Sequence, residues 1–357
     1  MILLPERYLI ALLNQLGDRV SVHAPLLQDA QLFTVDLSGS QARIEAIISA
    51  RDYHNQRDAV KRHTIDNLSG DTSLRIDAEL PKHDRLRDAF RAAGIVPPTN
   101  LDALKDYLRA AAQSDPARGG DIYYFAFDNN ALRNRLYSLY LKSTRRDRSE
   151  PNLLLSRAVR EELDTRGGKI LSEFLEAFNR AYQGVAIDQI FANQNRLDDR
   201  LRLMALAEYR KVLQSRNCEE LPAADSADAD GRIIDSYAGY ANAVGRKVVV
   251  LSSDNEFILR CEARPNLIPQ MVAYPLELDA AYETDWEALR WLLYQLAVVY
   301  GRLDLQLAKG AIVRVYGVWK GKTEHDWLQE HVKITITPSS IPLEAALQRT
   351  LNILQRV

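Results

Sequence analysis

The stretch VVVLSSDNEF at residues 248–257 decides the fold that we predict for this chain. Its apolar run ends in two small serines and a carboxylate, Asp254. A second stretch, IYYFAFDNN at residues 122–130, has the same pattern and delivers Asp128. Continuous apolar runs are typical of strands that are covered on both faces. The two runs therefore predict an α/β protein with a parallel sheet, and each strand ends in an aspartate at the edge where such sheets bind ligands.

The composition is that of an ordinary globular protein, and it excludes several classes. The 357 residues allow about two or three domains. The formal net charge is -2, so no global basic field indicates nucleic acid, and such binding would need a local patch. Two cysteines, Cys218 and Cys261, cannot form a disulfide framework. The sequence has no run of about 18 apolar residues and no basic-then-apolar leader, so we expect a cytoplasmic protein without a membrane span.

The order of predicted elements divides the chain into three parts. These are an N-terminal α+β domain of unknown role at 1–113, a central α/β domain at 121–275, and a C-terminal α+β extension at 280–357. The turn-rich segment 114–120 is the expected linker. Within the first part we expect a long polar helix from about residue 41 to 68 and a short strand at 73–76.

Four acidic residues of the central part stand out. They are Asp128, Glu162, Asp230 and Asp254. The first and the last follow predicted strands, the second lies on a predicted helix, and the third opens a helix. Carboxylates that meet at one sheet edge suit a hard divalent cation. Two assignments stay open, because Asp235 is a rival of Asp230 and Glu161 is a rival of Glu162.

The order and the local contexts of these acids resemble the PIN-domain nucleases. The pattern of that family is a strand ending in Asp-x-Asn, a helix with Glu before Leu, an Asp-x-x-Ile helix start, and a strand ending in Thr/Ser-x-Asp. All four motifs occur here in that order, over roughly residues 121–273. Ser252 stands where threonine is commoner, and the gap between Glu162 and Asp230 is long. The flanking parts have no counterpart in minimal members of the family.

The resemblance implies a three-layer α/β fold and a metal-dependent endoribonuclease. The implied ligands of Mg²⁺ or Mn²⁺ are Asp128, Asp230 and Asp254. Glu162 is expected to bind the metal or to orient a metal-bound water. Asn130 and Ser252 are candidates for positioning a carboxylate by hydrogen bonds. Because carboxylates in one cleft repel each other, some of their pKa values should rise when no metal is bound.

A basic stretch, KSTRRDR at residues 142–148, lies between the first two acids. Its cations are the expected contacts to a nucleic-acid backbone, namely Lys142, Arg145, Arg146 and Arg148. RNA is the expected partner because most of the resembled family cuts RNA, and single-stranded DNA is the alternative. The competing interpretation of this stretch is a solvated charged loop.

The predicted function is hydrolysis of RNA phosphodiester bonds, and other interpretations stay open. Asp128 and Asp230 could serve only as helix N-caps, and Asp254 could form only an Asx turn. The whole fold could be a catalytically silent scaffold that binds nucleic acid or a protein partner. It could also be a structure-specific DNA nuclease. The flanking parts could hold a protein partner or join copies into a homo-oligomer.

Overall fold

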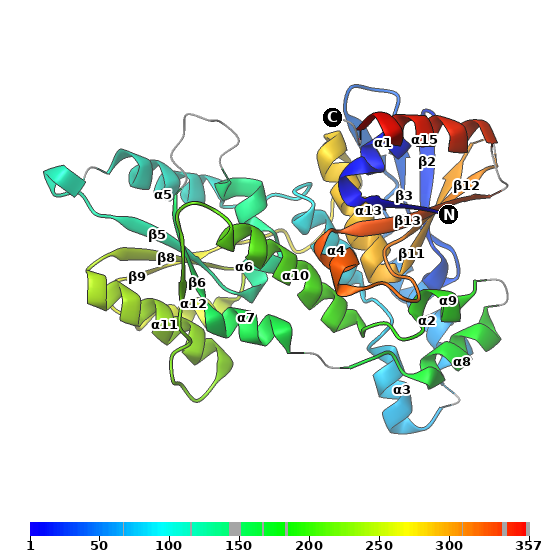
Figure 1. Ribbon diagram of the computed structural model, residues 1–357. Helices are drawn as coiled ribbons and strands as arrows, with labels where there is room; N and C mark the ends of the chain where they lie inside the picture. The colour runs from blue at the N-terminus through cyan, green and yellow to red at the C-terminus, as the bar shows by residue number, and fades with distance from the viewer. Residues whose placement is uncertain are drawn as a thin grey trace. The chain divides into compact units, whose positions relative to one another are not determined.

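The computed structural model describes residues 1–66, 68–114, 116–142, 151–165, 168–182, 185–308, 310–337 and 341–354. The chain divides into two compact units (Figure 1). Unit 1 comprises residues 1–95, 167–201 and 277–357, and unit 2 comprises residues 96–166 and 202–276. None of the helices in the described ranges combines the length and the apolar character needed to cross a lipid bilayer.

Unit 2 is built on a five-stranded parallel sheet with the order β7-β6-β5-β8-β9. The strands are β5 (Tyr123–Phe127), β6 (Asn152–Ser156), β7 (Cys218–Leu221), β8 (Lys247–Ser252) and β9 (Leu267–Met271). Residues 248–251 of β8 are fully buried. Because successive side chains of a strand point to opposite faces, both faces of the sheet must be covered. The predicted α/β class with a parallel sheet is confirmed, and the arrangement is compatible with a three-layer core.

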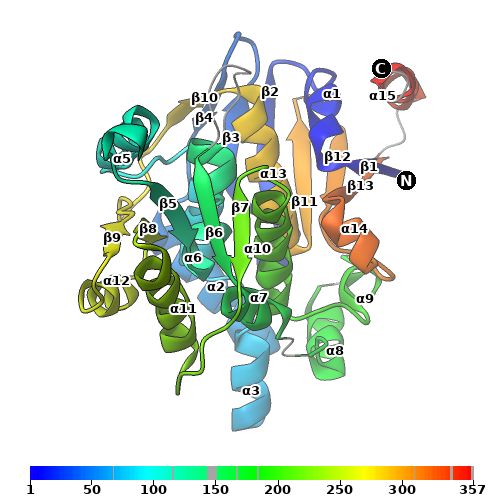
Figure 2. The ribbon, with the colours of Figure 1, turned by 60° about the vertical axis from the view of Figure 1, so that its left-hand side comes forward.

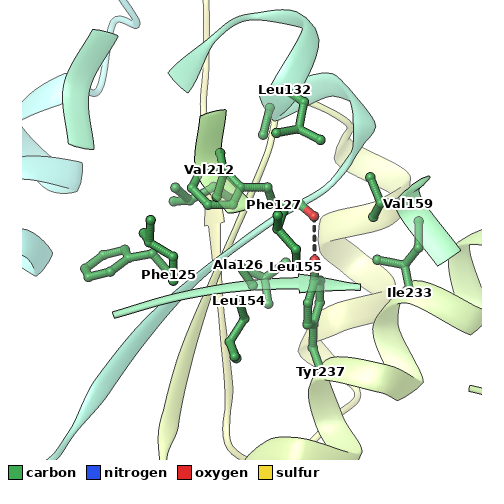
Figure 3. Close-up of a cluster of buried hydrophobic side chains, with 14 of the residues drawn as sticks. Phe125, Ala126, Phe127, Leu132, Leu154, Leu155, Val159, Val212, Ile233 and Tyr237 are labelled. Carbon is green, nitrogen blue, oxygen red and sulfur yellow. Dashed lines mark hydrogen bonds between the residues drawn. The ribbon is translucent and has the colours of Figure 1, made fainter. Parts of the chain in front are cut away.

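Helices flank this sheet; in Figure 1, α5 lies above it and α11 below it. The helices with residues in unit 2 are α5 (Leu101–Gln113), α6 (Asn129–Arg133), α7 (Arg157–Asp164), α10 (Leu197–Leu213), α11 (Ala229–Val244) and α12 (Asn255–Glu262). Figure 3 shows the apolar core at the centre of the sheet, where the hydroxyl of Tyr237 donates to the carbonyl of Phe127 at 2.7 Å. The same hydroxyl accepts from the amide of Ser156 at 3.2 Å. Tyr237 therefore joins the carboxyl ends of β5 and β6.

The strand order reverses between β5 and β8. The chain passes from β5 outward through β6 to β7, and then returns to β8 on the other side of β5 before it reaches β9. Open α/β sheets bind ligands at the carboxyl ends of the strands where the order reverses. Asp128 directly follows β5, and Asp254 follows β8 after one residue. The two aspartates predicted at strand ends thus lie at the switch point of the sheet.

Unit 1 contains an eight-stranded antiparallel sheet with the order β1-β13-β12-β11-β2-β3-β4-β10. Its strands are β1 (Ile2–Pro5), β2 (Arg19–Ala24), β3 (Ala30–Asp36), β4 (Ala42–Glu45), β10 (Tyr282–Thr284), β11 (Arg302–Leu307), β12 (Ile312–Tyr316) and β13 (His331–Thr337). Ile2 pairs with Ile334, and His23 pairs with Asp304. The first and last parts of the chain therefore share one sheet, whereas the sequence pattern predicted two separate parts at 1–113 and 280–357. Backbone pairing between distant segments leaves no local sequence signal.

The boundary of unit 2 also differs from the predicted one. The amide of Thr99 donates to the carbonyl of Ala273 at 2.8 Å, and the side chain of Asn100 donates to the carbonyl of Met271. These bonds place α5 in unit 2, so the predicted linker at 114–120 lies within this unit. Residues 167–201, predicted inside the central domain, belong instead to unit 1.

The helices of unit 1 correct two local predictions. They are α1 (Leu9–Leu13), α2 (Ala50–Thr64), α3 (Gly70–Asp77), α4 (His83–Ala92), α8 (Ser172–Ala181), α9 (Ile187–Phe191), α13 (Trp286–Tyr300), α14 (Glu324–Leu328) and α15 (Ile341–Leu354) (Figure 2). The helix predicted from about 41 to 68 is wrong at its start, because residues 42–45 pair with β3 and β10, and Ser49 caps α2. The strand predicted at 73–76 is wrong, because these residues lie in α3.

Lys322 is a buried cation of unit 1. Its Nζ donates to the carbonyls of Gly317 at 2.6 Å and His331 at 3.1 Å. It also lies 3.9 Å from the ring centroid of Trp327 and 4.6 Å from that of Trp319. Burial lowers the pKa of the Lys322 ammonium to about 7. Folding therefore changes the protonation of this group in the neutral to alkaline range.

A Lys322→Met substitution is expected to remove a pH dependence of stability. Unfolding returns the Lys322 pKa toward its ordinary 10.5, so between about pH 7 and 10 the unfolded chain holds more protons than the folded one. The free energy of unfolding should then rise with pH, by at most about 1.4 kcal/mol per unit. Denaturant titrations of both proteins across this range check the prediction. If the difference between native and variant proteins does not change with pH, the prediction fails.

Candidate active site

All four predicted acids line one pocket of unit 2. They reach it from separate elements: Asp128 follows β5, Glu162 lies on α7, Asp230 lies on α11, and Asp254 precedes α12. The remaining lining residues are Asn129, Asn130, Arg133, Ile233 and Phe257. The pocket therefore brings together, at the switch point of the sheet, acids that are separated by up to 126 positions in the sequence.

Asp128 is held at the bottom of this site by neutral hydrogen-bond donors. It is only 3% exposed. Its Oδ1 accepts from the amide of Ala131 at 2.6 Å, which makes it the N-cap of α6, and its Oδ2 accepts from the hydroxyl of Ser252. Burial raises the pKa of the Asp128 carboxyl to about 7, and the charge of Asp254 adds to the rise. The N-cap interpretation and the pocket interpretation of Asp128 therefore both apply.

Ser252 connects the two aspartates that follow β5 and β8. Its fully buried hydroxyl donates to Asp128 and accepts from the amide of Asp254 at 2.9 Å. The hydrogen bond that we expected from Ser252 is thus present. Asn130 also lines the pocket, and its side chain opposes the rise of the Asp128 pKa. Of the two residues predicted to position a carboxylate, Ser252 thus makes a direct hydrogen bond to Asp128.

Within the described ranges, Asp254 and Glu162 have carboxylate oxygens that no other group engages. Asp254 uses Oδ1 as the N-cap of α12, where it accepts from the amides of Glu256 at 2.9 Å and Phe257 at 3.3 Å. Among the described residues, no hydrogen-bond donor or cation contacts Oδ2 of Asp254 or the half-buried carboxylate of Glu162. These two side chains are the ones that could accept a new ligand without losing an existing partner.

The two rival acids of the open assignments point away from the pocket and pair with arginines. Glu161 forms an ion pair with Arg232, and Asp235 forms one with Arg264 at 2.8 Å. Neither acid lines the pocket. Glu162 and Asp230 are therefore the members of each pair that reach the site.

Asp230 lies in the first turn of α11 and has a cationic neighbour. Nη1 of Arg260 lies 3.3 Å from its Oδ2. Burial raises the pKa of the Asp230 carboxyl, Arg260 opposes this rise, and the charges of Asp254 and Asp228 add to it. The rise in pKa that we expected from mutual repulsion thus occurs at two of the four acids. Its larger cause is burial rather than repulsion.

The sequence pattern missed two polar residues of the pocket, Asn129 and Arg133. Asn129 is 9% exposed, and its Oδ1 is buried without a hydrogen-bond partner among the described residues. A buried polar atom without a partner costs about 1–3 kcal/mol, and native proteins keep few of them. Arg133, one helical turn further on, places a cation beside the acids. The available signal was position, because Asn129 directly follows the site aspartate at the end of β5 and Arg133 lies one turn later on α6.

An Asn129→Ala substitution should separate function from stability. The variant loses no side-chain hydrogen bond in the described structure, so its free energy of unfolding should change by less than about 1 kcal/mol. If the amide contacts a ligand in the pocket, the catalytic efficiency should fall by about ten- to a hundredfold. Thermal unfolding and steady-state kinetics of the same preparation provide the two measurements. A large loss of stability with unchanged kinetics would instead make Asn129 a packing residue.

The donor chemistry of the pocket fits a hard divalent cation that keeps part of its water shell. All candidate ligands are carboxylate or amide oxygens, which such ions prefer. In the described part of the chain, no three His, Cys, Asp or Glu side chains are grouped so that they could hold an ion by themselves, and this applies to the expected ligand set Asp128, Asp230 and Asp254. Mg²⁺ usually retains several waters and takes one or two carboxylates. Asp254 and Glu162, with their unengaged oxygens, match that requirement.

Only the first residue of the basic stretch, Lys142, belongs to the described ranges. Lys142 is exposed and directly follows the helical segment Tyr137–Leu141. The other three predicted contacts, Arg145, Arg146 and Arg148, lie outside the described residues.

Comparison with known proteins adds no family to this picture. No protein-family model matches the chain, and comparison with curated proteins finds no match. A function can therefore be inferred only from the residues of the pocket and from their order in the sequence.

Proposed function

We propose that unit 2 is a metal-dependent nuclease that hydrolyses phosphodiester bonds of RNA with Mg²⁺ or Mn²⁺. One observation carries the proposal: the four acids that resemble the PIN-domain pattern line a single pocket at the switch point of a parallel sheet. RNA is the proposed substrate because most members of the resembled family cut RNA. The proposal covers unit 2 alone and assigns no role to unit 1.

The residues of the pocket have complementary tasks in this reaction. When bound, the cation supplies an activated water and neutralises charge on the phosphate. Asp254 and Glu162 would hold the ion through their unengaged oxygens. Asp230 would add a further negative charge to the same pocket. The deeply buried Asp128, fixed by Ser252 and Ala131, would orient waters of the ion and set the negative potential of the pocket.

Arg133 gives the pocket a second kind of contact. A phosphodiester is an anion, and a pocket of carboxylates alone would repel it. A guanidinium at the pocket wall offers hydrogen bonds to phosphate oxygens, a pairing that is short and strong. The amide of Asn129 lies on the same side, one turn before Arg133. We therefore propose that the acids of the pocket hold the cation and that Asn129 and Arg133 of α6 contact the phosphate.

The test is cleavage of labelled single-stranded RNA, duplex RNA and single-stranded DNA by the full chain in EDTA, Mg²⁺ or Mn²⁺. Two matched pairs of variants make it specific. Glu162→Gln is compared with Glu161→Gln, and Asp230→Asn is compared with Asp235→Asn. Within each pair the same charge is removed from the same helix, and only the first member lines the pocket. Metal-dependent cleavage should be lost in the first members and retained in the second. Equal effects within each pair would contradict the proposed site.

A catalytically silent scaffold of the same fold is the second candidate. The observation that favours it is the commitment of two acids to internal partners, since both oxygens of Asp128 accept hydrogen bonds and Asp230 pairs with Arg260. Tight metal-independent binding of RNA, without cleavage of any substrate in either metal, would support this candidate. Cleavage of branched or flapped DNA alone would instead indicate a structure-specific DNA nuclease.

A further inference from the structure

Arg260 of α12 binds two acids of α11 with one guanidinium. Its Nη2 contacts both carboxylate oxygens of Asp228, at 2.8 and 3.1 Å, and its Nη1 lies 3.3 Å from Oδ2 of Asp230. Asp228 is the N-cap of α11 and accepts from the amide of Gly231 at 2.8 Å. The same arginine therefore holds the start of a helix and an acid of the pocket.

The packing at Gly231 shows that this arrangement is closely built. A Cβ atom at this position would lie 3.3 Å from Nη2 of Arg260 and would overlap the hydroxyl of Ser226. A side chain here would push against the guanidinium or the loop before α11. The absence of a side chain at Gly231 thus lets Arg260 approach both carboxylates at hydrogen-bond distance.

The position of Arg260 has an electrostatic consequence for the pocket. Asp230 lines the pocket with three further acids, and the arginine partly neutralises this negative charge. A divalent cation that binds there must share Asp230 with the guanidinium or displace it. Either way, the presence of Arg260 reduces the attraction that the pocket exerts on the ion.

We propose that Arg260 is a positioning residue that acts as the resident counter-cation of Asp230. It keeps this carboxylate at the pocket wall and weakens the binding of a divalent cation, so that the site fills only at a higher metal concentration. The inference rests on the proposed function, because it takes Asp230 as part of a metal site. It adds that the protein's own cation sets the metal affinity of that site.

The chain offers a matched control close to the same two helices. Arg264, two residues beyond the C-terminal end of α12, contacts Asp235 of α11 at 2.8 and 3.0 Å. Neither residue of this second pair lines the pocket. Removing Arg264 therefore breaks an ion pair to the same helix α11 without changing the charge beside Asp230.

The experiment is calorimetric titration of the full chain with Mn²⁺ alone, for the native protein and the variants Arg260→Gln, Arg260→Lys and Arg264→Gln. Arg260→Gln should bind Mn²⁺ roughly three- to tenfold more tightly, as expected for removing one partly exposed charge next to a ligand. Arg260→Lys keeps the charge and should stay within about twofold of the native protein. Arg264→Gln should also stay near the native value, and thermal unfolding in EDTA shows whether the variants are folded.

The outcomes separate this inference from the proposed function. One outcome is that Arg260→Gln binds Mn²⁺ no more tightly than Arg264→Gln, while the native protein binds Mn²⁺ and cleaves RNA. In that case the role proposed for Arg260 is wrong and the proposed nuclease function is unaffected. If none of the proteins binds Mn²⁺, both proposals fail. An Asp230→Asn background gives an additional check, because the two changes should be non-additive if they act through one contact. Additive effects on affinity would overturn the role assigned to the Arg260–Asp230 pair.

Discussion

An Asp128→Asn substitution is expected to lower the rate of metal-dependent cleavage at least about a thousandfold and to leave the protein folded. The change removes the negative charge at the bottom of the pocket and keeps the shape of the side chain. Asparagine is also a good N-cap residue, so its carbonyl can still accept from the amide of Ala131. The loss should therefore be chemical rather than structural.

The same variant should be as stable as the native protein in EDTA, or more stable by about 1–2 kcal/mol. Burial raises the pKa of Asp128 from 3.8 to about 7, so the ionised form is disfavoured in the folded state. Between these two pH values the folded chain holds more protons than the unfolded one, and native stability falls as the pH rises. The amide carries no charge and avoids this loss at neutral pH.

In the presence of Mn²⁺, the native protein should be more stable than Asp128→Asn. A ligand that binds only the folded state at a hundred times its Kd adds about 2.7 kcal/mol. The native protein should gain this stabilisation, and Asp128→Asn should gain much less. Thermal unfolding followed by circular dichroism, with and without Mn²⁺, gives the comparison beside Asp235→Asn as the control. Native-like cleavage by Asp128→Asn would place the chemistry outside this pocket.

A Gly317→Ala substitution is expected to lower the free energy of unfolding of unit 1 by more than about 3 kcal/mol and to prevent its folding in many conditions. A Cβ atom at Gly317 would overlap backbone atoms of Ala297 and Val298 in α13. Residues 289–300 of this helix are buried throughout, so the helix cannot move aside without disturbing the core. The clash is with backbone, and no change of rotamer relieves it.

Tryptophan fluorescence provides a reporter of unit 1 alone. The four tryptophans of the chain lie at residues 286, 291, 319 and 327, all within this unit. Gly70→Ala is the matched control, because nothing lies within 4 Å of the added carbon at the start of α3. For this control we expect the free energy of unfolding to change by less than about 1 kcal/mol. A denaturation midpoint of Gly317→Ala equal to that of Gly70→Ala would show that α13 and the segment directly after β12 can move apart.

The sequence by itself determined the class of unit 2 and the acids of its pocket. A strand that is buried on both faces must be apolar at every position, so residues 248–251 carry their own signal. The carboxylates follow such strands or begin helices, which are also local features. Their order along the chain was therefore enough to group them, and the structure places all four in one pocket.

Only the tertiary structure decided which neighbouring acids reach the pocket and which segments pair. Adjacent residues of a helix point about 100° apart, so the sequence cannot tell whether Glu161 or Glu162 faces inward until the helix is packed. Arg232 and Arg260 reach their acids from other helices, and Arg264 reaches Asp235 from the segment after α12. The single sheet of unit 1 joins strands from both ends of the chain through backbone hydrogen bonds. Backbone groups are the same in every residue, and for that reason the pairing of distant strands is settled only when the chain is folded.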